Sequence, residues 1–548
     1  MLGPALPPAK RDQLVTGRRH EKFLLLLLLS LTLLIAGYWV TRYAGLIMEG
    51  DATRLTQAGE GIANEGRLVT AQSYLNGYGY PALLAFLIQT TGLTAQVLQI
   101  AGSFWLVPLA LAAYLAYREL LPDIRLAILA VILLLLHPDF LFYILRSSHE
   151  RTTWTFGLLI LWLWVRSNRS QEVELRLAMV LSLYLLLWAV IANNAYFGST
   201  IVTTFLLAML ANYVLARFFR RASRGGTPMG FHNRMLYVWL SGFALLFLFI
   251  TYVYSPATSY YYTLGTIGEK VSVLFLGSEP ISQRMAVDDT YGYVQTAWLS
   301  PTVYLLLTGF QWLIVVLAIG AWLRDGVALL RRGHTVLSQQ RLLLWLFFLG
   351  FATQVGLGVI SDLSGAMGSN LQVRLFTPFA LVVSPMAATW FTALRRIPWR
   401  RLNALRPALM PLGAMVACVA VIATLLKVTN DPVVGNQWLF YSPGEQVALD
   451  WTDDHLKDRE IWIDTWQHQF DVLLFRRGYD WKPRNNYRSG SLAEWRSDEV
   501  SHVLLSDLTV LQANRSKLPL PMVVDRDIVY DNGDAQLFHR RQRSPFQK

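Results

Sequence analysis

Two carboxylates, Glu49 and Asp51, stand where the first long apolar run of the chain ends. Arg54 follows within one helical turn of Asp51. An ionisable side chain at the edge of a bilayer is costly unless it is paired or functional. On these residues alone three interpretations stay open: solvated interfacial carboxylates, structural partners for Arg54, or a general base for chemistry at the membrane surface.

Further polar residues stand at the ends of later apolar runs. His149 and Glu150 lie in Arg146-Ser147-Ser148-His149-Glu150-Arg151, where they could pair with the flanking arginines, position an acceptor or bind a metal ion. Arg374 opens a late apolar run after a stretch, 361–373, that has no basic residue. It could bind a phosphate through its planar fork, or it could be an interfacial arginine whose head group reaches water.

The composition assigns most of the chain to a membrane. Of its 548 residues, 54% are hydrophobic and 15% are charged, against about 25% charged in soluble proteins. The excess forms long uncharged runs, and a bilayer is spanned by roughly 20 apolar residues. The net charge is +12, but the arginines gather in short loops between apolar runs, as they do in cytoplasmic loops. We therefore expect an all-α polytopic membrane protein with no nucleic-acid partner.

The apolar runs predict about eleven transmembrane helices, after a cytoplasmic segment 1–22. The expected spans are 23–46, 97–117, 125–145, 152–166, 175–196, 199–217, 234–254, 302–323, 341–360, 374–394 and 406–427. Together they form a transmembrane domain over 23–427, with long external loops at 47–96 and 255–301. In the first loop, Tyr80–Leu93 is too short to cross, so we expect an interfacial helix with Tyr80 at headgroup depth.

After about residue 428 the chain becomes polar and of mixed charge. The runs Glu460–Thr465 and Val503–Ser506 are typical of strands, and Asn532-Gly533 between two further runs predicts a hairpin. Pro443–Leu456 has helical spacing. These patterns predict a small external α/β domain over 428–548, on the side of the membrane opposite the N-terminus.

Several stretches of the chain occur in an order known from one superfamily. They are Gly50-Asp51-Ala52, Tyr80-Pro81-Ala82-Leu83 with Thr91-Gly92-Leu93, His137-Pro138-Asp139 with the arginine-flanked group at 146–151, and Asn370–Pro378. In this order they resemble the GT-C fold integral membrane glycosyltransferases, which include aminoarabinose and mannosyl transferases that use polyprenyl-phosphate sugars. The chain departs from that pattern at Leu55, where many relatives have an aromatic residue, and at Glu49, which precedes Asp51 instead of following it. These departures leave the acceptor class open.

The resemblance implies roles for the polar residues. Asp51, with Glu49 beside it, would be the catalytic carboxylate, and Arg374 would bind the donor phosphate. The other expected substrate-binding residues are Glu150, His149, Arg54 and Tyr80. A lipid-linked sugar donor, a glycan, lipid or protein acceptor, contact with membrane lipids and location in a bacterial inner membrane with the C-terminus in the periplasm are implied in the same way. A divalent cation is possible in such a site.

Two other classes of protein compete with this interpretation. A transporter or flippase for a lipid-linked glycan would be expected to contain inverted repeats and broken helices, and the sequence contains no internal repeat. An O-antigen polymerase or ligase would rely on arginines in large external loops more than on an acid directly after the first span. The sequence contains no nucleotide-binding glycine-rich loop and no zinc-ligand spacing, which favours a donor carried on a lipid.

Overall fold

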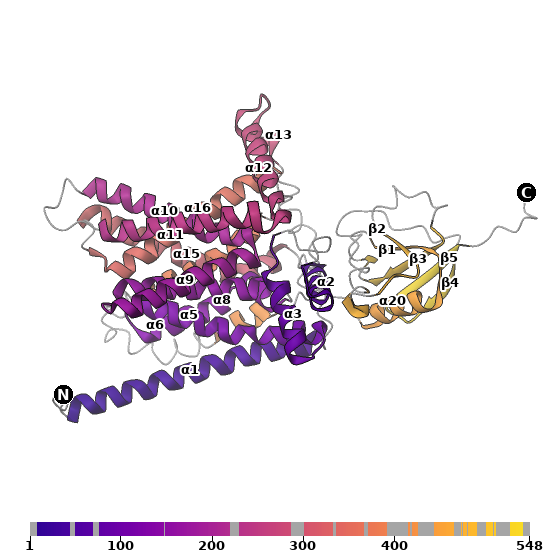
Figure 1. Ribbon diagram of the computed structural model, residues 1–548, viewed down its shortest axis with the longest axis horizontal. Helices are drawn as coiled ribbons and strands as arrows, with labels where there is room; N and C mark the ends of the chain where they lie inside the picture. The colour runs from indigo at the N-terminus through magenta and orange to yellow at the C-terminus, as the bar shows by residue number, and fades with distance from the viewer. Residues whose placement is uncertain are drawn as a thin grey trace, which may run out of the picture.

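The computed structural model describes residues 8–43, 50–68, 76–146, 148–219, 229–285, 301–332, 336–365, 371–391, 415–416, 419–425, 443–464, 473, 475–478, 481–489, 500–507, 509–510 and 526–540. These residues form a bundle of helices and, beyond one end of it, a small domain built on a β-sheet (Figure 1). The helices before residue 200 are α1 (Pro8–Tyr43), α2 (Gly50–Glu65), α3 (Gly79–Thr91), α4 (Ala95–Ala101), η2 (Gly102–Trp105), α5 (Leu106–Leu120), α6 (Ile124–Leu135), α7 (Pro138–Leu145), α8 (Glu150–Arg169), α9 (Val173–Asn193) and α10 (Ala195–Phe219). They are followed by α11 (Met229–Leu248), η3 (Phe249–Val253), η4 (Ser255–Thr258), α12 (Ser259–Leu276), α13 (Ile281–Arg284), α15 (Pro301–Arg332), α16 (Gln339–Leu363) and α17 (Leu371–Ala388).

Seven helical stretches of the described chain are long and apolar enough to cross a membrane. They are Glu21–Arg42, Ala95–Leu120, Val173–Asn193, Ala195–Arg217, Met235–Val253, Gly309–Arg331 and Gln339–Leu363. Each corresponds to one of the expected spans. The expected span 152–166 lies inside α8, whose two ends carry charged residues, and 374–394 begins in α17, a shorter apolar helix. Most of 406–427 lies outside the described residues, so the total of eleven stays a prediction.

The expected span 125–145 differs from a single straight helix. It consists of α6 and α7, which meet at an angle of 76°. The break falls at Pro138, where the preceding residue His137 has the extended backbone angles φ −89° and ψ 103°. Proline disfavours the helical region for the residue before it, and this explains why the helix turns here. Beyond the bend, α7 packs against α8, α17 and η2.

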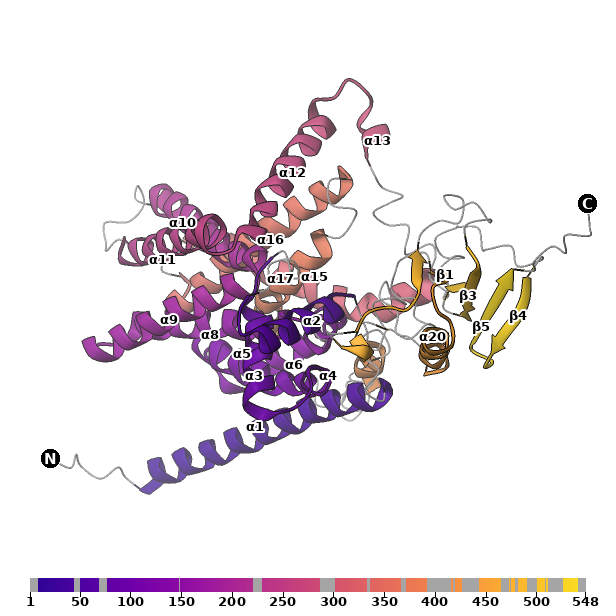
Figure 2. The same cartoon turned by 45° about the vertical axis from the view of Figure 1, so that its right-hand side comes forward.

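Both long loops that the sequence analysis expects outside the membrane contain helices. In the first, α2 and α3 cover one end of the bundle, between the bundle and the C-terminal domain (Figure 1). A helix is present where one was expected over Tyr80–Leu93: it is α3, which runs from Gly79 to Thr91, and its interfacial position stays a prediction. In the second loop, α12 projects away from the bundle with α13 beyond it (Figures 1 and 2).

The C-terminal domain contains α20 (Pro443–His455) and the strands β1 (Glu460–Asp464), β2 (Asn486–Ser489), β3 (His502–Ser506), β4 (Arg526–Asp531) and β5 (Ala535–Arg540). The strand order is β2-β1-β3-β5-β4. Strand β1 pairs in parallel with β2 and β3, while β5 pairs antiparallel with β3 and β4. The hairpin expected at Asn532-Gly533 is confirmed, with Gly533 at φ +88°, a region that favours glycine. Leu449 of α20 packs with Ile461 and Leu537 in the core of the domain.

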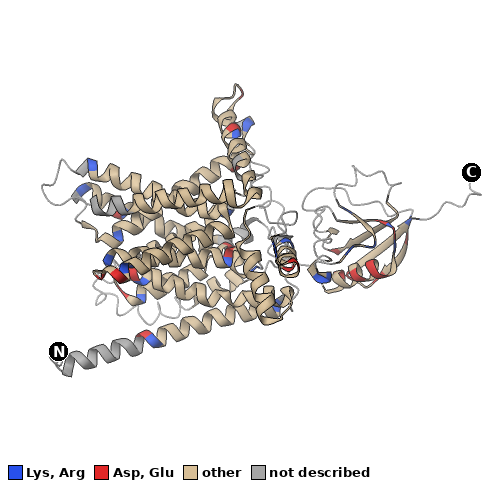
Figure 3. Cartoon of the chain, viewed as in Figure 1, with Lys and Arg blue, Asp and Glu red and all other residues tan. Residues whose placement is uncertain are grey.

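The two ends of the bundle differ in character. Basic side chains gather at the end where α1 begins, and the C-terminal domain lies beyond the opposite end (Figure 3). That domain contacts the bundle through Gln96 of α4, whose Nε2 donates hydrogen bonds to the carbonyl oxygen of Phe475 at 2.8 Å and to Oε1 of Glu60 at 3.1 Å. The end of the bundle covered by α2 and α3 is thus also the end that meets the C-terminal domain.

Candidate functional site

Helix α2 presents the first of the expected site residues. Its backbone begins at Gly50, so Asp51 stands in its first turn, while Glu49 and the side chain of Asp51 lie outside the described residues. Ala52, Leu55 and Ala58 recur at helical spacing and are buried. Arg54 is exposed to solvent on the same helix. The apolar face therefore anchors α2 to the bundle, and Arg54 does not join the buried charges described next.

A buried group of charged residues lies at the junction of α7 and α8. Nη2 of Arg146 donates to Oε1 of Glu150 at 2.5 Å, with only 3% and 4% of the two side chains exposed. Nδ2 of Asn194 lies 2.5 Å from Nε2 of His149. With the amide nitrogen as donor, Nε2 is the acceptor and the ring proton resides on Nδ1. Nδ1 in turn lies 3.6 Å from Oε2 of Glu150, so the carboxylate faces both the guanidinium and the imidazole.

Arg151 is the most deeply buried cation of this group. Its side chain is 1% exposed, and it donates to two backbone carbonyl oxygens, that of Gln99 at 3.2 Å and that of Arg146 at 2.5 Å. No carboxylate of the described residues forms an ion pair with it, although Glu150 interacts with its charge at longer range. A Cβ at Gly102 would lie 1.7 Å from Nη1 of Arg151. Only glycine leaves room here for the guanidinium.

A chain of hydrogen bonds connects this group to α2. The hydroxyl of Tyr80 donates to Oε1 of Gln99 at 2.7 Å, and Nε2 of Gln99 donates to Oγ1 of Thr56 at 3.0 Å. Thr56 in turn donates to the carbonyl oxygen of Ala52, the residue after Asp51, at 2.7 Å. Burial raises the pKa of Tyr80 above its usual value, so its hydroxyl keeps its proton at neutral pH. Gln99 thereby joins Arg151 to the first turn of α2.

Arg374 belongs to the same neighbourhood through Tyr143. The guanidinium of Arg146 stacks over the ring of Tyr143 at 4.5 Å from its centroid. The hydroxyl of Tyr143 also lies within electrostatic range of Arg374, Glu150 and Asp139. Asp139, which its place beside Pro138 suggests as a helix cap, instead accepts a hydrogen bond from Nε2 of Gln311 at 2.7 Å. Tyr143 of α7 therefore contacts Arg146 directly and interacts electrostatically with Arg374 of α17.

Asp362 fixes the start of the helix that carries Arg374. Its carboxylate accepts hydrogen bonds from the backbone N–H groups of Leu371 at 3.0 Å and Gln372 at 2.8 Å. The first N–H groups of a helix have no partner inside the helix, and a carboxylate there also suits the helix dipole. Arg374 follows in the first turn of α17 and is partly exposed.

The structure thus brings together some of the residues expected from the sequence. Glu150, His149 and Tyr80 belong to one buried network, and Arg374 lies within electrostatic range of it. Residues that the sequence did not single out also contact this network: Gln99, Asn194 and Tyr143. Gln99 offered a signal, because it is a polar side chain within an apolar run. Among the described residues, no three His, Cys, Asp or Glu side chains lie close enough to share a metal ion.

Comparison with solved structures shows the class of fold. The oligosaccharyltransferase of Archaeoglobus fulgidus in its apo form has a TM-score of 0.57 at 12% identity, over 88% of this chain and 69% of that one. The archaeal oligosaccharyltransferase AglB from the same organism, in complex with an inhibitory peptide and a dolichol-phosphate, has a TM-score of 0.55 at 13% identity over the same shares, 88% and 69%. ArnT from Cupriavidus metallidurans in the apo state has a TM-score of 0.52 at 12% identity, over 94% of this chain and 97% of that one. No protein-family model matches the chain, and no curated protein matches it.

The chain is therefore a multi-pass membrane protein with the GT-C fold, as the resemblance in its sequence implied. At 12% to 13% identity the likeness is one of fold. It assigns no role to the charged network at the junction of α7 and α8.

Proposed function

We propose that this chain is a glycosyltransferase that moves a sugar from a polyprenyl-phosphate donor to a hydroxyl group of a glycan, lipid or protein. The observation that carries the proposal is the buried network of Arg146, Glu150 and Arg151 on a GT-C fold, joined by hydrogen bonds to the first turn of α2. Buried charges of this kind are costly in a membrane protein and are retained mainly for function. One solved structure of similar fold contains a dolichol-phosphate, a lipid phosphate of the class proposed here.

The reaction that we propose requires one base and one cation. The acceptor oxygen gives its proton to the carboxylate of Asp51 and forms a bond to the anomeric carbon of the donor sugar. The bond from that carbon to the phosphate oxygen breaks, and the lipid phosphate leaves with the electron pair. A general base contributes about 10²- to 10⁴-fold to such a step. Arg374, with its planar fork of donors, would stabilise the charge that develops on the departing phosphate.

The orientation in the membrane that we propose follows from the difference in charge between the two ends of the bundle. The basic end, where α1 begins, would face the cytoplasm, in accord with the positive-inside rule. Helices α2 and α3 and the C-terminal domain would then lie on the periplasmic face of a bacterial inner membrane. A lipid-linked donor enters from the bilayer at this face, where the acceptor is also available. Glu49, Arg54 and His149 are further candidates for contacts with the acceptor.

The decisive experiment compares donor classes with the purified full-length chain in liposomes. We expect release of free polyprenyl phosphate when a polyprenyl-phosphate sugar and a cell-envelope extract are supplied, and no turnover with the matching nucleotide sugar. Consumption of the nucleotide sugar alone would overturn the proposal. Movement of the intact lipid-linked sugar across the bilayer, without release of polyprenyl phosphate, would instead identify a transporter.

A further inference from the structure

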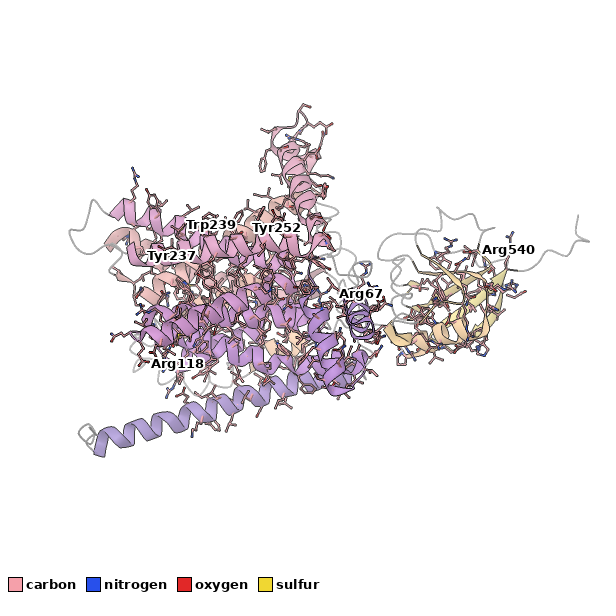
Figure 4. The ribbon with its side chains drawn as sticks, in the orientation of Figure 1. Arg67, Arg118, Tyr237, Trp239, Tyr252 and Arg540 are labelled. Carbon is pink, nitrogen blue, oxygen red and sulfur yellow. The ribbon has the colours of Figure 1, made fainter. Side chains whose placement is uncertain are left out.

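A second polar site lies at the basic end of the bundle, far along the helices from the charged network of α7 and α8. It is a pocket of about 810 Å³ between the end of α5, the end of α8, the last turns of α15 and the start of α16. Figure 4 shows Arg118 at this end of the helical bundle and Arg67, which follows α2, at the end nearer the C-terminal domain. The charged residues that line the pocket are Arg118, Glu119, Arg169, Arg324, Asp325 and Arg341.

Each carboxylate of this pocket is already bound by two arginines. Glu119 contacts Arg169 and also Arg166, the latter at 3.1 Å. Asp325 contacts Arg324 at 3.1 Å and Arg341 at 2.5 Å. Four arginines against two carboxylates leave the lining with a net charge of +2. Because Glu119 and Asp325 are mostly buried, they hold guanidinium groups in place without neutralising the pocket.

The surroundings place the pocket at the level of lipid headgroups. The guanidinium of Arg324 stacks over Trp390 at 4.9 Å from the ring centroid, and Trp322 stacks on Trp345 at 5.1 Å. Tryptophan is enriched where a transmembrane helix meets the membrane surface. On α15, beside the pocket, Val327 and Leu330 are 46% and 63% exposed. A cationic pocket therefore adjoins an apolar surface that runs into the bilayer.

We propose that this pocket binds the phosphate-bearing headgroup of an anionic phospholipid, whose acyl chains lie along the exposed apolar face of α15. Guanidinium groups bind phosphate oxygens in bidentate fashion, and basic pockets between transmembrane helices are suited to anionic lipids. The apolar surface at Val327 and Leu330 distinguishes a lipid from free phosphate, which would gain nothing from it. The site is separate from the proposed donor site and does not depend on the proposed reaction.

The test measures lipid retention by native mass spectrometry on the full-length chain in detergent, with phosphatidylglycerol and phosphatidylcholine as probes. We expect the chain to retain phosphatidylglycerol and to release phosphatidylcholine. Arg118→Gln combined with Arg169→Gln should weaken the retention of phosphatidylglycerol about 25-fold. These two arginines are chosen because both are exposed, so their loss spares the more buried pair of Asp325 and Arg341. Thermal unfolding of the double variant in lipid-free detergent checks that the bundle stays folded.

The matched control is Arg217→Gln, which removes an exposed arginine from the last turn of α10, outside the pocket. We expect this variant to retain phosphatidylglycerol as the unaltered chain does. An equal loss in the control, or equal retention of both lipids, would overturn the proposal. Displacement of phosphatidylglycerol by millimolar inorganic phosphate would also overturn it, because the pocket would then be a site for a soluble anion.

Discussion

Nη2 of Arg146 donates a hydrogen bond of 2.5 Å to Oε1 of Glu150, and the protein buries both side chains almost completely. Removing one member of a buried ion pair leaves the other charge without compensation, at a cost of about 3–5 kcal/mol. We therefore expect Glu150→Gln to lower the thermal unfolding temperature of the detergent-solubilised chain markedly. Glu65→Gln is the control, because its partner Arg67 is 80% exposed and such surface pairs contribute about 0–1 kcal/mol.

A double variant separates the ion pair from other effects of the Glu150 substitution. Arg146→Met together with Glu150→Gln removes both charges, so it should recover much of the stability that Glu150→Gln alone loses. If the double variant unfolds at the same temperature as the single one, the buried charge of Arg146 is not the cause of the loss.

Gly102 is the second point at which the network can be tested. A Cβ there would lie 1.7 Å from Nη1 of Arg151, so Gly102→Ala must push the guanidinium away from the carbonyl oxygen of Gln99. Loss of a charged hydrogen bond in a buried site costs about 1.5–3 kcal/mol. The expected result is a lower unfolding temperature. Gly37→Ala in α1 is the control, since no atom lies within 4 Å of its Cβ position, and it should unfold at the original temperature or slightly above.

The proposed orientation predicts which residues a membrane-impermeant maleimide can reach. In a Cys418→Ser background, a cysteine in place of Val529, which is 44% exposed on β4, should react in cells whose outer membrane alone has been permeabilised. A cysteine in place of Arg217, at the basic end of the bundle, should react only after the inner membrane is opened. The reverse pattern would show that the N-terminus faces outwards and that the proposed site lies in the cytoplasm.

The sequence predicts correctly those helices and hairpins whose conformation depends only on a short stretch of neighbouring residues. The hairpin between β4 and β5 depends on Asn532-Gly533 alone, and the expected helix Tyr80–Leu93 needed only its length and apolar character. Strand β2 was missed because Asn486–Ser489 has no apolar alternation, and its conformation depends on parallel pairing with β1. The bend can be predicted from Pro138, because a proline disfavours helix at the residue before it. The expectation of one straight span over 125–145 took no account of this proline.

In the candidate site too, contacts between residues close in the sequence are predictable, whereas contacts between distant residues are not. Arg146, His149 and Glu150 are close in the sequence, so their pairing could be anticipated. Gln99 of α4 and Asn194, between α9 and α10, contact the same network from about 50 residues away in the sequence, and nothing local indicates that contact. Asp362 reaches the start of α17 across nine residues, too far for the spacing of an ordinary helix cap. Arg54, expected at the site, is exposed because the apolar positions of α2 lie on its other face.

Arg374 is expected to determine affinity for the donor. Arg374→Lys keeps the charge but loses the planar fork, so the KM for the polyprenyl-phosphate sugar should rise about tenfold while the protein still inserts. Initial rates over a range of donor concentrations measure this effect. Arg67→Lys, a change at an exposed residue of the same end of the molecule, is the control and should leave the KM unaltered. An unchanged KM in Arg374→Ala would exclude this residue from the donor site.

Asp51 carries the strongest prediction about catalysis. Asp51→Asn keeps the size of the side chain and part of its hydrogen bonding, but an amide cannot accept a proton from the acceptor hydroxyl. The purified variant should insert and unfold like the original chain and transfer sugar about 10²- to 10⁴-fold more slowly. Glu65→Gln, at the far end of α2, is the matched control and should transfer sugar at the original rate.

Glu49→Gln distinguishes the two carboxylates at the end of the first span. It should cost less than Asp51→Asn, because Glu49 precedes α2 and matches the position of the acid in the GT-C pattern less well. A wild-type rate in Asp51→Asn with a large loss in Glu49→Gln would exchange their roles. Should both variants transfer sugar at the original rate, no carboxylate at this position is the base, and the glycosyltransferase proposal would lose its catalytic group.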